Sequence, residues 1–229
     1  MIEATHVTKK FGRKHVLRDL TFSADKGQIT CLIGINGAGK STLLKAIMGL
    51  TPINAGQIRI DGQPVSPAIY EKIAFVPDAL TMPPSMTIAD SLRFMRDYYR
   101  SWNPARATEL LAFFRLNAED RLSSLSKGGA AKLNLLLGLS LNTDYLLMDE
   151  PFSGIDIFSR EQIASVFTSD LIEDRGVVLT THEIGEIEHL IDRAVILDRG
   201  EVRIAFDCEE MRMTEGKSVI DVMREVYRA

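Results

Sequence analysis

Residues 34–42 read Gly34-Ile-Asn-Gly-Ala-Gly-Lys-Ser-Thr42, which matches the pattern G-x-x-x-x-G-K-[ST] in full. The residues before them, Ile29–Ile33, form a compact apolar run with β-branched side chains, which predicts a buried strand. Apolar residues return at helical spacing over residues 40–48, and Gly49 is expected to end that helix. A strand, a glycine-rich loop and a helix in this order predict a loop whose backbone N–H groups surround a phosphate group.

Each residue type in this loop has a chemical reason. Glycine lets the backbone approach phosphate closely, and the start of the following helix presents its positive dipole end to the same anion. Lys40 places a cation beside the β- and γ-phosphates of ATP, and the Ser41 hydroxyl is a ligand for Mg²⁺. The expected nucleotide contacts of the loop are Gly34, Asn36, Gly37, Ala38, Gly39, Lys40, Ser41 and Thr42. An incidental glycine-rich turn is disfavoured because a strand precedes the loop and a helix follows it.

A second motif lies at the end of another apolar run, Tyr145–Met148, which is followed by Asp149 and Glu150. Open parallel sheets carry their sites at such strand ends. We expect Asp149 to hold Mg²⁺, usually through water, and Glu150 to act as the general base that polarises the attacking water. Taken alone, the pair is equally compatible with a solvated strand end, but the loop at Gly34 favours the functional interpretation.

The wider pattern predicts an α/β fold: a P-loop NTPase core with a mostly parallel sheet, an amino-terminal antiparallel β subdomain and an inserted α-helical subdomain. Residues 1–25 alternate apolar and polar side chains around a turn at Phe11-Gly12, which predicts short strands. Helical patterns and clustered aromatic residues fill residues 81–122. Further strands are expected over residues 56–62, 73–76, 177–180 and 194–197. A final amphipathic helix carries Val219, Val222, Met223 and Val226 on one stripe.

Length and composition fit one globular domain. The chain has 229 residues, of which 45% are hydrophobic and 25% are charged, which is enough apolar material for a substantial core. We expect a single domain over residues 1–229. Its catalytic core and β subdomain would span residues 1–80 and 145–229, and its helical subdomain about 81–144. The formal net charge of −4 argues mildly against a nucleic-acid partner.

Two features bear on the location of the chain. The two cysteines, Cys31 and Cys208, have no metal-ligand spacing, which predicts a reducing cytoplasm. The most apolar stretch, residues 133–141, is less than half of the roughly 20 residues that a membrane helix needs. We also expect no signal peptide, because basic residues interrupt the first apolar run. Another polypeptide must then supply any channel.

With both motifs in place, the chain resembles the nucleotide-binding domain of ATP-binding cassette (ABC) transporters over nearly its whole length. Leu125-Ser-Lys-Gly-Gly129 lies where the family signature, usually Leu-Ser-Gly-Gly-Gln, precedes a helix. Ser153-Gly-Ile-Asp156 is similar to the D-loop, His182 to the switch histidine, and Phe11 to the aromatic residue that stacks on adenine. Each has a structural alternative: a helix cap for the signature serine and the D-loop aspartate, a structural role for the histidine, and a core position for the phenylalanine.

The resemblance implies a composite site shared by two cassettes, which are either two copies of this chain or two different chains. ATP would lie on the loop of one cassette while Ser126 and Gly128 of the other contact its γ-phosphate. The resemblance also implies catalytic roles for Glu150, His182 and Lys40, and a membrane-spanning transporter subunit as partner. We therefore expect an ATP-hydrolysing subunit that is cytoplasmic and peripheral on the inner face of the cell membrane.

Two residues depart from the family pattern. The family normally has glutamine after its fourth strand, whereas Val76-Pro-Asp78 supplies an aspartate. Repulsion between this carboxylate and phosphate reaches about 4 kcal/mol at about 4 Å for an effective dielectric constant of about 20, so it must be offset. Because Mg²⁺ accepts carboxylate oxygens, we expect Asp78 to join Ser41 and Asp149 as a metal ligand. Lys127 replaces the first glycine of the signature, and it points either toward the partner's γ-phosphate or outward.

The signature sequence Ser126-Lys-Gly128 resembles variants in ATPase subunits of bacterial exporters for peptides or antibiotics, so we expect export. A soluble ABC protein acting on the ribosome or nucleic acid is the main alternative, and it is disfavoured because the chain has one cassette and no heptad run. A regulatory nucleotide-binding module with low turnover is a further alternative. The departures at Asp78 and Lys127 are compatible with a module of low turnover, whereas Glu150 and His182 argue against it.

Overall fold

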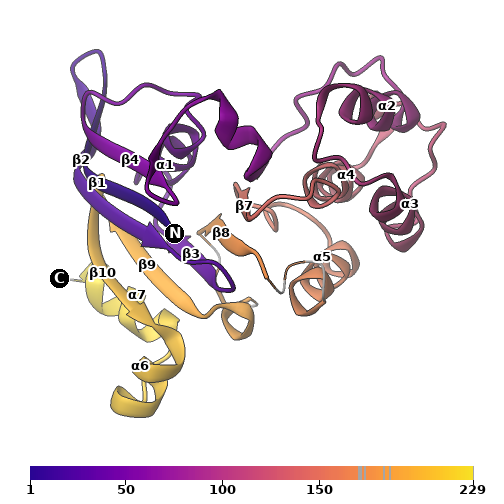
Figure 1. The fold of residues 1–229 in the computed structure, drawn as a ribbon. Helices are drawn as coiled ribbons and strands as arrows, with labels where there is room; N and C mark the ends of the chain where they lie inside the picture. Colours follow the sequence, from indigo (N-terminus) through magenta and orange to yellow (C-terminus); the bar gives the residue numbers. More distant parts are fainter. Residues whose placement is uncertain (170–171, 173, 183, 186, 229) are drawn as a thin grey trace.

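The centre of the molecule is a six-stranded sheet with the order β10-β9-β3-β8-β7-β6 (Figure 1). The structure, a computed structural model, describes residues 1–169, 172, 174–182, 184–185 and 187–228. Neighbouring strands run parallel except β10, which is antiparallel to β9. The strands are β3 (Ile29–Ile33), β6 (Ile73–Val76), β7 (Tyr145–Met148), β8 (Gly176–Thr181), β9 (Arg193–Asp198) and β10 (Glu201–Asp207). The predicted mostly parallel α/β core is confirmed.

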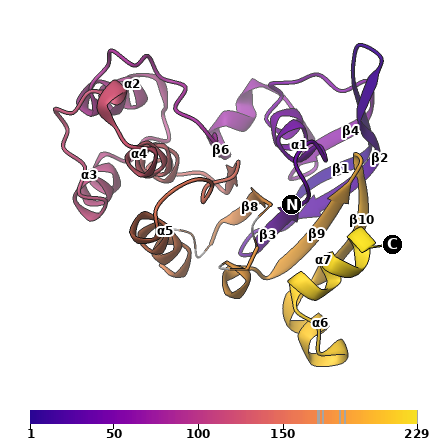
Figure 2. The same ribbon diagram turned by 180° about the vertical axis from the view of Figure 1, so that it is seen from behind.

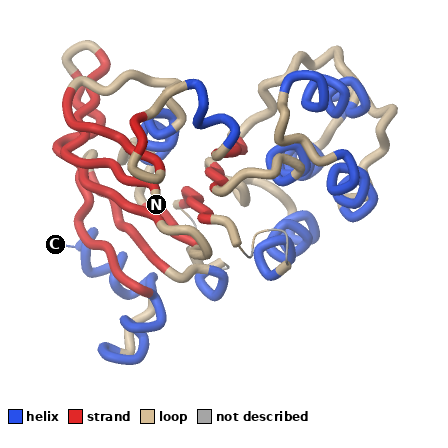
Figure 3. The backbone as a smooth tube through the Cα atoms, viewed as in Figure 1, coloured by secondary structure: helices blue, strands red, loops and turns tan. Residues whose placement is uncertain are grey.

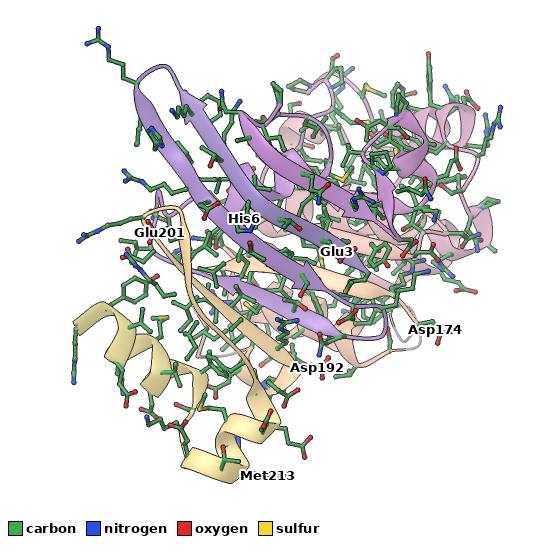
Figure 4. All side chains as sticks on the ribbon, turned by 60° about the vertical axis from the view of Figure 1, so that its left-hand side comes forward. Glu3, His6, Asp174, Asp192, Glu201 and Met213 are labelled. Atoms are coloured by element: carbon green, nitrogen blue, oxygen red, sulfur yellow. The ribbon has the colours of Figure 1, made fainter. Side chains whose placement is uncertain are left out.

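A separate antiparallel sheet with the order β2-β1-β4-β5 confirms the predicted amino-terminal β subdomain. Its strands are β1 (Ile2–Phe11), β2 (Lys14–Ala24), β4 (Ala55–Ile60) and β5 (Gln63–Pro64). The first two strands are longer than predicted, because irregularities in their pairing interrupt the alternation that marks a strand in sequence. Two successive irregularities include His6 and Asp19, whose φ angles are 54° and 48°. Figure 4 looks onto this side of the molecule, with Glu3 and His6 labelled on β1.

Alternate residues of the parallel strands face two hydrophobic cores, which gives the molecule its layers. On β3, Leu32 belongs to the core shared with the antiparallel sheet, whereas Cys31 and Ile33 belong to the core on the opposite face. Helix α1 (Lys40–Ile47) fills the space between the two sheets with Leu43, Leu44 and Ile47. The sheet therefore carries the start of α1 at its carboxyl-terminal edge, next to the ends of β7 and β8.

Helices α2, α3 and α4 form a lobe at the end of the molecule away from the antiparallel sheet (Figures 1 and 3). Polar caps begin three of the helices in this part of the chain: Thr87 forms a capping box with Asp90, Asn103 caps α3 and Ser126 caps α4. The helices are α2 (Ile88–Tyr98), α3 (Pro104–Phe113), α4 (Lys127–Leu139) and α5 (Ile157–Ala164). Short 3₁₀ helices are η1 (Pro67–Glu71), η2 (Leu122–Ser124), η3 (Ser165–Thr168) and η4 (Glu188–Leu190).

Two carboxyl-terminal helices, α6 (Cys208–Glu215) and α7 (Val219–Arg228), pack beside β9 and β10 (Figures 1 and 2). As predicted, α7 buries one stripe, with Val219 and Val222 almost fully enclosed. Strand β10 and α6 were not predicted, although apolar residues alternate along β10 in the manner of an edge strand. In the part of the chain that the structure describes, no helix has the length and apolar character needed to cross a membrane.

Candidate active site

One cleft of about 750 Å³ brings together most of the residues that the sequence predicts for nucleotide binding. Loops that follow β3, β6, β7 and β8 supply its walls, since the carboxyl-terminal ends of these parallel strands meet at one edge. The predicted residues in its lining are Asn36, Gly37, Ala38, Gly39, Lys40, Ser41, Thr42, Asp78, Glu150 and His182. Gly34 and Asp149 lie directly behind this lining, where they accept hydrogen bonds from Lys40 and Ser41.

The loop between β3 and α1 has room only for glycine at two positions. A Cβ added at Gly34 would lie 2.8 Å from the carbonyl oxygen of Leu197 on β9. Gly39 has a φ of 112°, and a Cβ added there would lie 2.9 Å from the carbonyl oxygen of Val16 on β2. A larger residue at either position would push the loop away from the strands behind it. The glycine spacing therefore follows from packing as well as from access to phosphate.

Lys40 is a cation held in a nearly closed environment at the first residue of α1. Its side chain is 6% exposed, and its Nζ donates a hydrogen bond to the Gly34 carbonyl oxygen at 2.7 Å. The same Nζ lies 3.2 Å from Oε1 of Glu150. The ammonium group therefore connects the phosphate-binding loop to the acidic end of β7. It lies at the base of the cleft, largely shielded from solvent.

Asp149 accepts two hydroxyl hydrogen bonds on the same carboxylate oxygen. Its Oδ1 accepts from Ser41 Oγ at 2.8 Å and from Thr180 Oγ1 at 2.7 Å, and the residue is 2% exposed. Thr180 Oγ1 in turn accepts the backbone N–H of Glu150 at 2.9 Å. Thr180 therefore orders the Asp149 carboxylate and the backbone of Glu150, a role that was not predicted from the sequence. The signal for it is a hydroxyl residue at the end of an apolar strand, two positions before His182.

Glu150 has an unusual backbone and two charged or polar neighbours. Its φ of 48° lies in the left-handed region, which costs a residue with a Cβ about 1–3 kcal/mol when the surrounding structure enforces it. Its Oε2 lies 2.8 Å from Nδ1 of His182, and its side chain is 15% exposed. Strain of this kind concentrates at functional sites, and here it turns the carboxylate toward the cleft that Lys40 and His182 also line.

The donors around Ser41 suit Mg²⁺. A hydroxyl and a carboxylate are hard oxygen ligands, and Mg²⁺ commonly binds through one or two carboxylates together with substrate phosphates. The described residues contain no group of three or more His, Cys, Asp or Glu side chains placed to hold a metal alone. A metal bound here would take water molecules or the phosphates of a nucleotide as its remaining ligands, and the phosphate-binding loop lies beside it.

Besides Gly34 and Asp149, three predicted residues are not in the described lining of the cleft: Phe11, Ser126 and Gly128. Phe11 is 54% exposed, and the Nζ of Lys9 lies 4.6 Å from its ring centroid, so it is not a core residue. Ser126 begins α4 and accepts the N–H of Gly129 at 3.1 Å. Gly128 packs so closely on α5 that an added Cβ would lie 2.5 Å from Ser159 Oγ. Ser126 is thus a helix cap, which is one of the alternatives stated above.

Asp156 of the D-loop is also a helix cap, at the start of α5. It accepts hydrogen bonds from the backbone N–H and the hydroxyl of Ser159 at 2.9 and 2.7 Å. These hydrogen bonds hold the pKa of the Asp156 carboxyl below its usual range. Because Gly128 also contacts Ser159, the D-loop and the signature segment are fixed to each other through one residue.

The two departures from the family pattern both lie at the cleft. Asp78 is exposed in the loop after β6, and this loop is tied to α4 by a 3.0 Å hydrogen bond from Asn134 Nδ2 to the Pro77 carbonyl oxygen. Lys127 turns toward its own D-loop, since a Cβ added at Gly154 would lie 3.5 Å from its Nζ. Lys127 therefore lines the cleft of its own chain.

A parallel sheet with a phosphate-binding loop at its edge, and an acidic strand end beside that loop, define the chain as a P-loop nucleotide-binding protein. The family model described as ABC transporter matches residues 17–153. The chain belongs to this family, as the ATP-binding and ATP-hydrolysing subunit of an ABC transporter.

Relatives and solved structures agree with this assignment. The chain is 33% identical over 212 residues to the linearmycin resistance ATP-binding protein LnrL of Bacillus subtilis strain 168, covering 88% of this chain and 68% of the relative. It is 34% identical over 207 residues to the Nod factor export ATP-binding protein I of Burkholderia orbicola, covering 87% of this chain and 68% of that protein. A solved ATP-binding subunit of an ABC transporter superposes with a TM-score of 0.87 at 27% identity, with 99% of both chains covered. The same fold occurs in a cassette solved as a dimer with ADP and phosphate, at a TM-score of 0.79 and 24% identity, covering 90% of this chain and 98% of that one.

Proposed function

We propose that this ATPase subunit powers export through a separate membrane-spanning protein, and that two cassettes close on ATP to drive each cycle. One observation carries the catalytic part of the proposal: Glu150 is held in a left-handed conformation between Lys40 and His182, at the edge of a cleft that the phosphate-binding loop also lines. The names of the two relatives, one a resistance protein and the other an export protein, support the direction of transport.

The residues of the cleft divide the reaction between them. Lys40 and the backbone N–H groups of residues 36–42 bind the β- and γ-phosphates, and Gly34 keeps the loop against β9. Ser41 and Asp149 hold Mg²⁺, which neutralises phosphate charge when it is bound.

The chemical step uses the acidic end of β7. Water attacks the γ-phosphorus while Glu150 takes its proton, and the bond from that phosphorus to the bridging oxygen breaks to give ADP and phosphate. His182 orients the Glu150 carboxylate through the 2.8 Å contact between Nδ1 and Oε2.

The second cassette completes the site. Ser126 and the amide of Gly128 lie at the start of α4, and a helix amino terminus with a serine hydroxyl binds anions. Ser126 is exposed and therefore accessible to the γ-phosphate on a partner cassette, whereas Gly128 is buried against Ser159 and contributes only its N–H at the start of the helix. The exposed ring of Phe11 stacks on adenine. Residues 1–80 and 145–229 form the catalytic core and residues 81–144 the helical subdomain that swings the signature segment.

The membrane partner places a helix in the cleft between the helical subdomain and the sheet core, near residues 78–86 and 98–102, which holds the chain on the inner face of the cell membrane. Tyr98 is 73% exposed and stacks on Phe94 with 4.5 Å between ring centroids, so the pair offers a preformed apolar surface. Aromatic residues of this kind dominate the binding energy of protein interfaces. No nucleic acid is needed for this function.

Replacing Tyr98 with alanine is expected to reduce recovery of the membrane-spanning protein at least tenfold when the two are co-expressed and purified together in detergent, because an interface anchor is lost. Phe113→Ala is the matched control, since Phe113 is 43% exposed on the neighbouring helix α3 and stands outside the proposed contact. Recovery of RNA in place of a membrane protein would favour the nucleic-acid alternative. Equal recovery of the membrane-spanning protein with both variants would mean that Tyr98 does not contact it.

Replacing Asp78 with glutamine is expected to raise the Mg²⁺ concentration that gives half-maximal ATP turnover, because an amide oxygen is a weaker ligand for a hard cation than a carboxylate. The measurement is ATPase activity over a Mg²⁺ titration at fixed ATP. Asp97→Gln changes an exposed carboxylate on α2 outside the cleft and is the control. If Asp78→Gln leaves both Mg²⁺ dependence and turnover unchanged, Asp78 is not a metal ligand.

A further inference from the structure

The carboxyl-terminal helix α7 begins against the segment that follows His182. The Val219 N–H donates a 2.9 Å hydrogen bond to Oε1 of Glu188, and Val219 is 2% exposed. One residue further along, Ile220 packs on the same segment, because a Cβ added at Gly185 would lie 3.5 Å from its Cδ1. The first turn of α7 is therefore fixed to the chain just beyond the switch histidine.

The last turn of α7 reaches the back of the phosphate-binding loop. The Tyr227 hydroxyl donates a 2.5 Å hydrogen bond to the carbonyl oxygen of Leu197. That same carbonyl oxygen is the atom that leaves no room for a side chain at Gly34, the first residue of the loop. One backbone oxygen of β9 thus contacts the loop on one side and takes the tyrosine hydroxyl on the other.

Tyr227 also lies beside the loop itself. The backbone of Ile35 lowers the pKa of the Tyr227 phenol, but burial raises that pKa more strongly, so the net shift is upward. The phenol therefore keeps the proton that it donates to Leu197 at neutral pH. Met223 and Tyr227 also line a small cavity of about 270 Å³ together with Gly34, Ile35, Asn36 and His182.

These contacts make α7 a brace between two parts of the site. Ile35 is 55% exposed and lines the small cavity beside Tyr227 instead of the nucleotide cleft, so its side chain does little to hold the loop segment 34–36 in shape. Behind it, β9 and Tyr227 supply the fixed surface. Holding a binding loop in its bound shape before the ligand arrives raises affinity, since less ordering remains to be done on binding.

We propose that Tyr227 is a positioning residue for the phosphate-binding loop, and that α7 couples the shape of this loop to the segment after His182. The proposal rests on the role proposed above for residues 34–42. It extends the nucleotide site to the carboxyl-terminal helix, which lies outside the segment that matches the family model.

The alternative is that Tyr227 only fastens α7 to the body of the protein. Loss of one hydrogen bond would then lower thermal stability but leave nucleotide affinity and KM for ATP unchanged. The chain offers a matched control for this alternative, because the Tyr70 hydroxyl also donates to a backbone carbonyl oxygen, that of Met48, at 3.1 Å. Met48 is the carboxyl-terminal cap of α1, at the end of that helix away from the phosphates.

The test compares Tyr227→Phe with Tyr70→Phe in the full chain, by calorimetric titration with ATP and Mg²⁺, by steady-state kinetics and by thermal unfolding. Tyr227→Phe is expected to weaken ATP binding and raise KM by about three- to tenfold, the effect of one hydrogen bond, with a smaller change in kcat. Tyr70→Phe is expected to lower the melting temperature to a similar degree without changing affinity. Tyr227→Leu, which also removes the ring, should weaken binding further than the phenylalanine variant.

Unchanged ATP affinity in Tyr227→Phe, with the melting temperature lowered as in Tyr70→Phe, would overturn the proposal and leave Tyr227 as an anchor for α7. Lys40→Met belongs in the same titration series. If that variant loses ATP binding while Tyr227→Phe does not, the bracing role fails and the proposed nucleotide site stands. If both variants bind ATP normally, the assignment of the loop itself is wrong.

Discussion

Glu150→Gln is expected to lower the rate of ATP hydrolysis at least 100-fold, the usual effect of losing a positioned general base. Glutamine has the shape of glutamate but cannot take a proton from the attacking water. Its amide can still occupy the place between Lys40 and His182, where the carboxylate oxygens now lie 3.2 Å and 2.8 Å from their partners. ATP binding should therefore survive while the chemical step fails, and a single-turnover assay with radiolabelled ATP measures the two separately.

The same variant should accumulate as a dimer of cassettes when ATP and Mg²⁺ are present, because closure depends on bound ATP and opening depends on its hydrolysis. Size-exclusion chromatography with light scattering reports the change in mass. Glu161→Gln, an identical substitution at an exposed position of α5, should hydrolyse ATP at the normal rate and stay monomeric under these conditions. Normal turnover in Glu150→Gln would assign the base to another group.

Local sequence patterns predicted the fold and the position of the cleft for a physical reason. The runs Ile29–Ile33 and Tyr145–Met148 are buried on both faces except at Ile29, so they are apolar apart from Thr30 and easily recognised. Each ends abruptly in the residues that line the cleft, since the sheet carries its polar groups at that edge. Each motif directly follows its strand in the sequence, so both can be predicted without knowing which distant segments are in contact.

What the sequence did not predict depends on contacts between distant segments. Thr180 orders Asp149 and Glu150 across neighbouring strands, yet a threonine in a strand is ordinary in composition. The left-handed backbone conformation of Glu150 cannot be predicted from its residue type, because only the surrounding structure enforces it. Lys127 turns toward Gly154 of its own chain, a direction that depends on how α4 and α5 pack.

Lys40→Met is expected to weaken ATP binding about 1,000-fold. An ammonium group about 4 Å from a phosphate charge contributes about 4 kcal/mol at an effective dielectric constant of about 20, and about 1.4 kcal/mol corresponds to a factor of ten. The estimate applies here because the Lys40 side chain is 6% exposed, so solvent screens it little. Methionine keeps the length and apolar stem of the side chain and removes the charge.

Lys45→Met is the matched control, since Lys45 lies on the same helix with an exposed side chain. It should leave ATP affinity within a factor of about two, because exposed charges contribute little. Titration calorimetry with ATP and Mg²⁺ compares the two variants directly, and thermal unfolding checks that both remain folded. Equal affinity of Lys40→Met and the control would remove Lys40 from the phosphate site.

The effects of substituting Lys40 and Glu150 on stability should not be additive. Removing the lysine alone leaves the Glu150 carboxylate, 15% exposed, without the cation that lies 3.2 Å away, so part of the stability lost in Lys40→Met belongs to the glutamate. In the double variant Lys40→Met, Glu150→Gln, that penalty is absent because the glutamine is neutral. The double variant should therefore unfold at a higher temperature than Lys40→Met alone, while ATP binding stays as weak as in the single variant. Additive effects on stability would mean that the two charges do not interact in the folded protein.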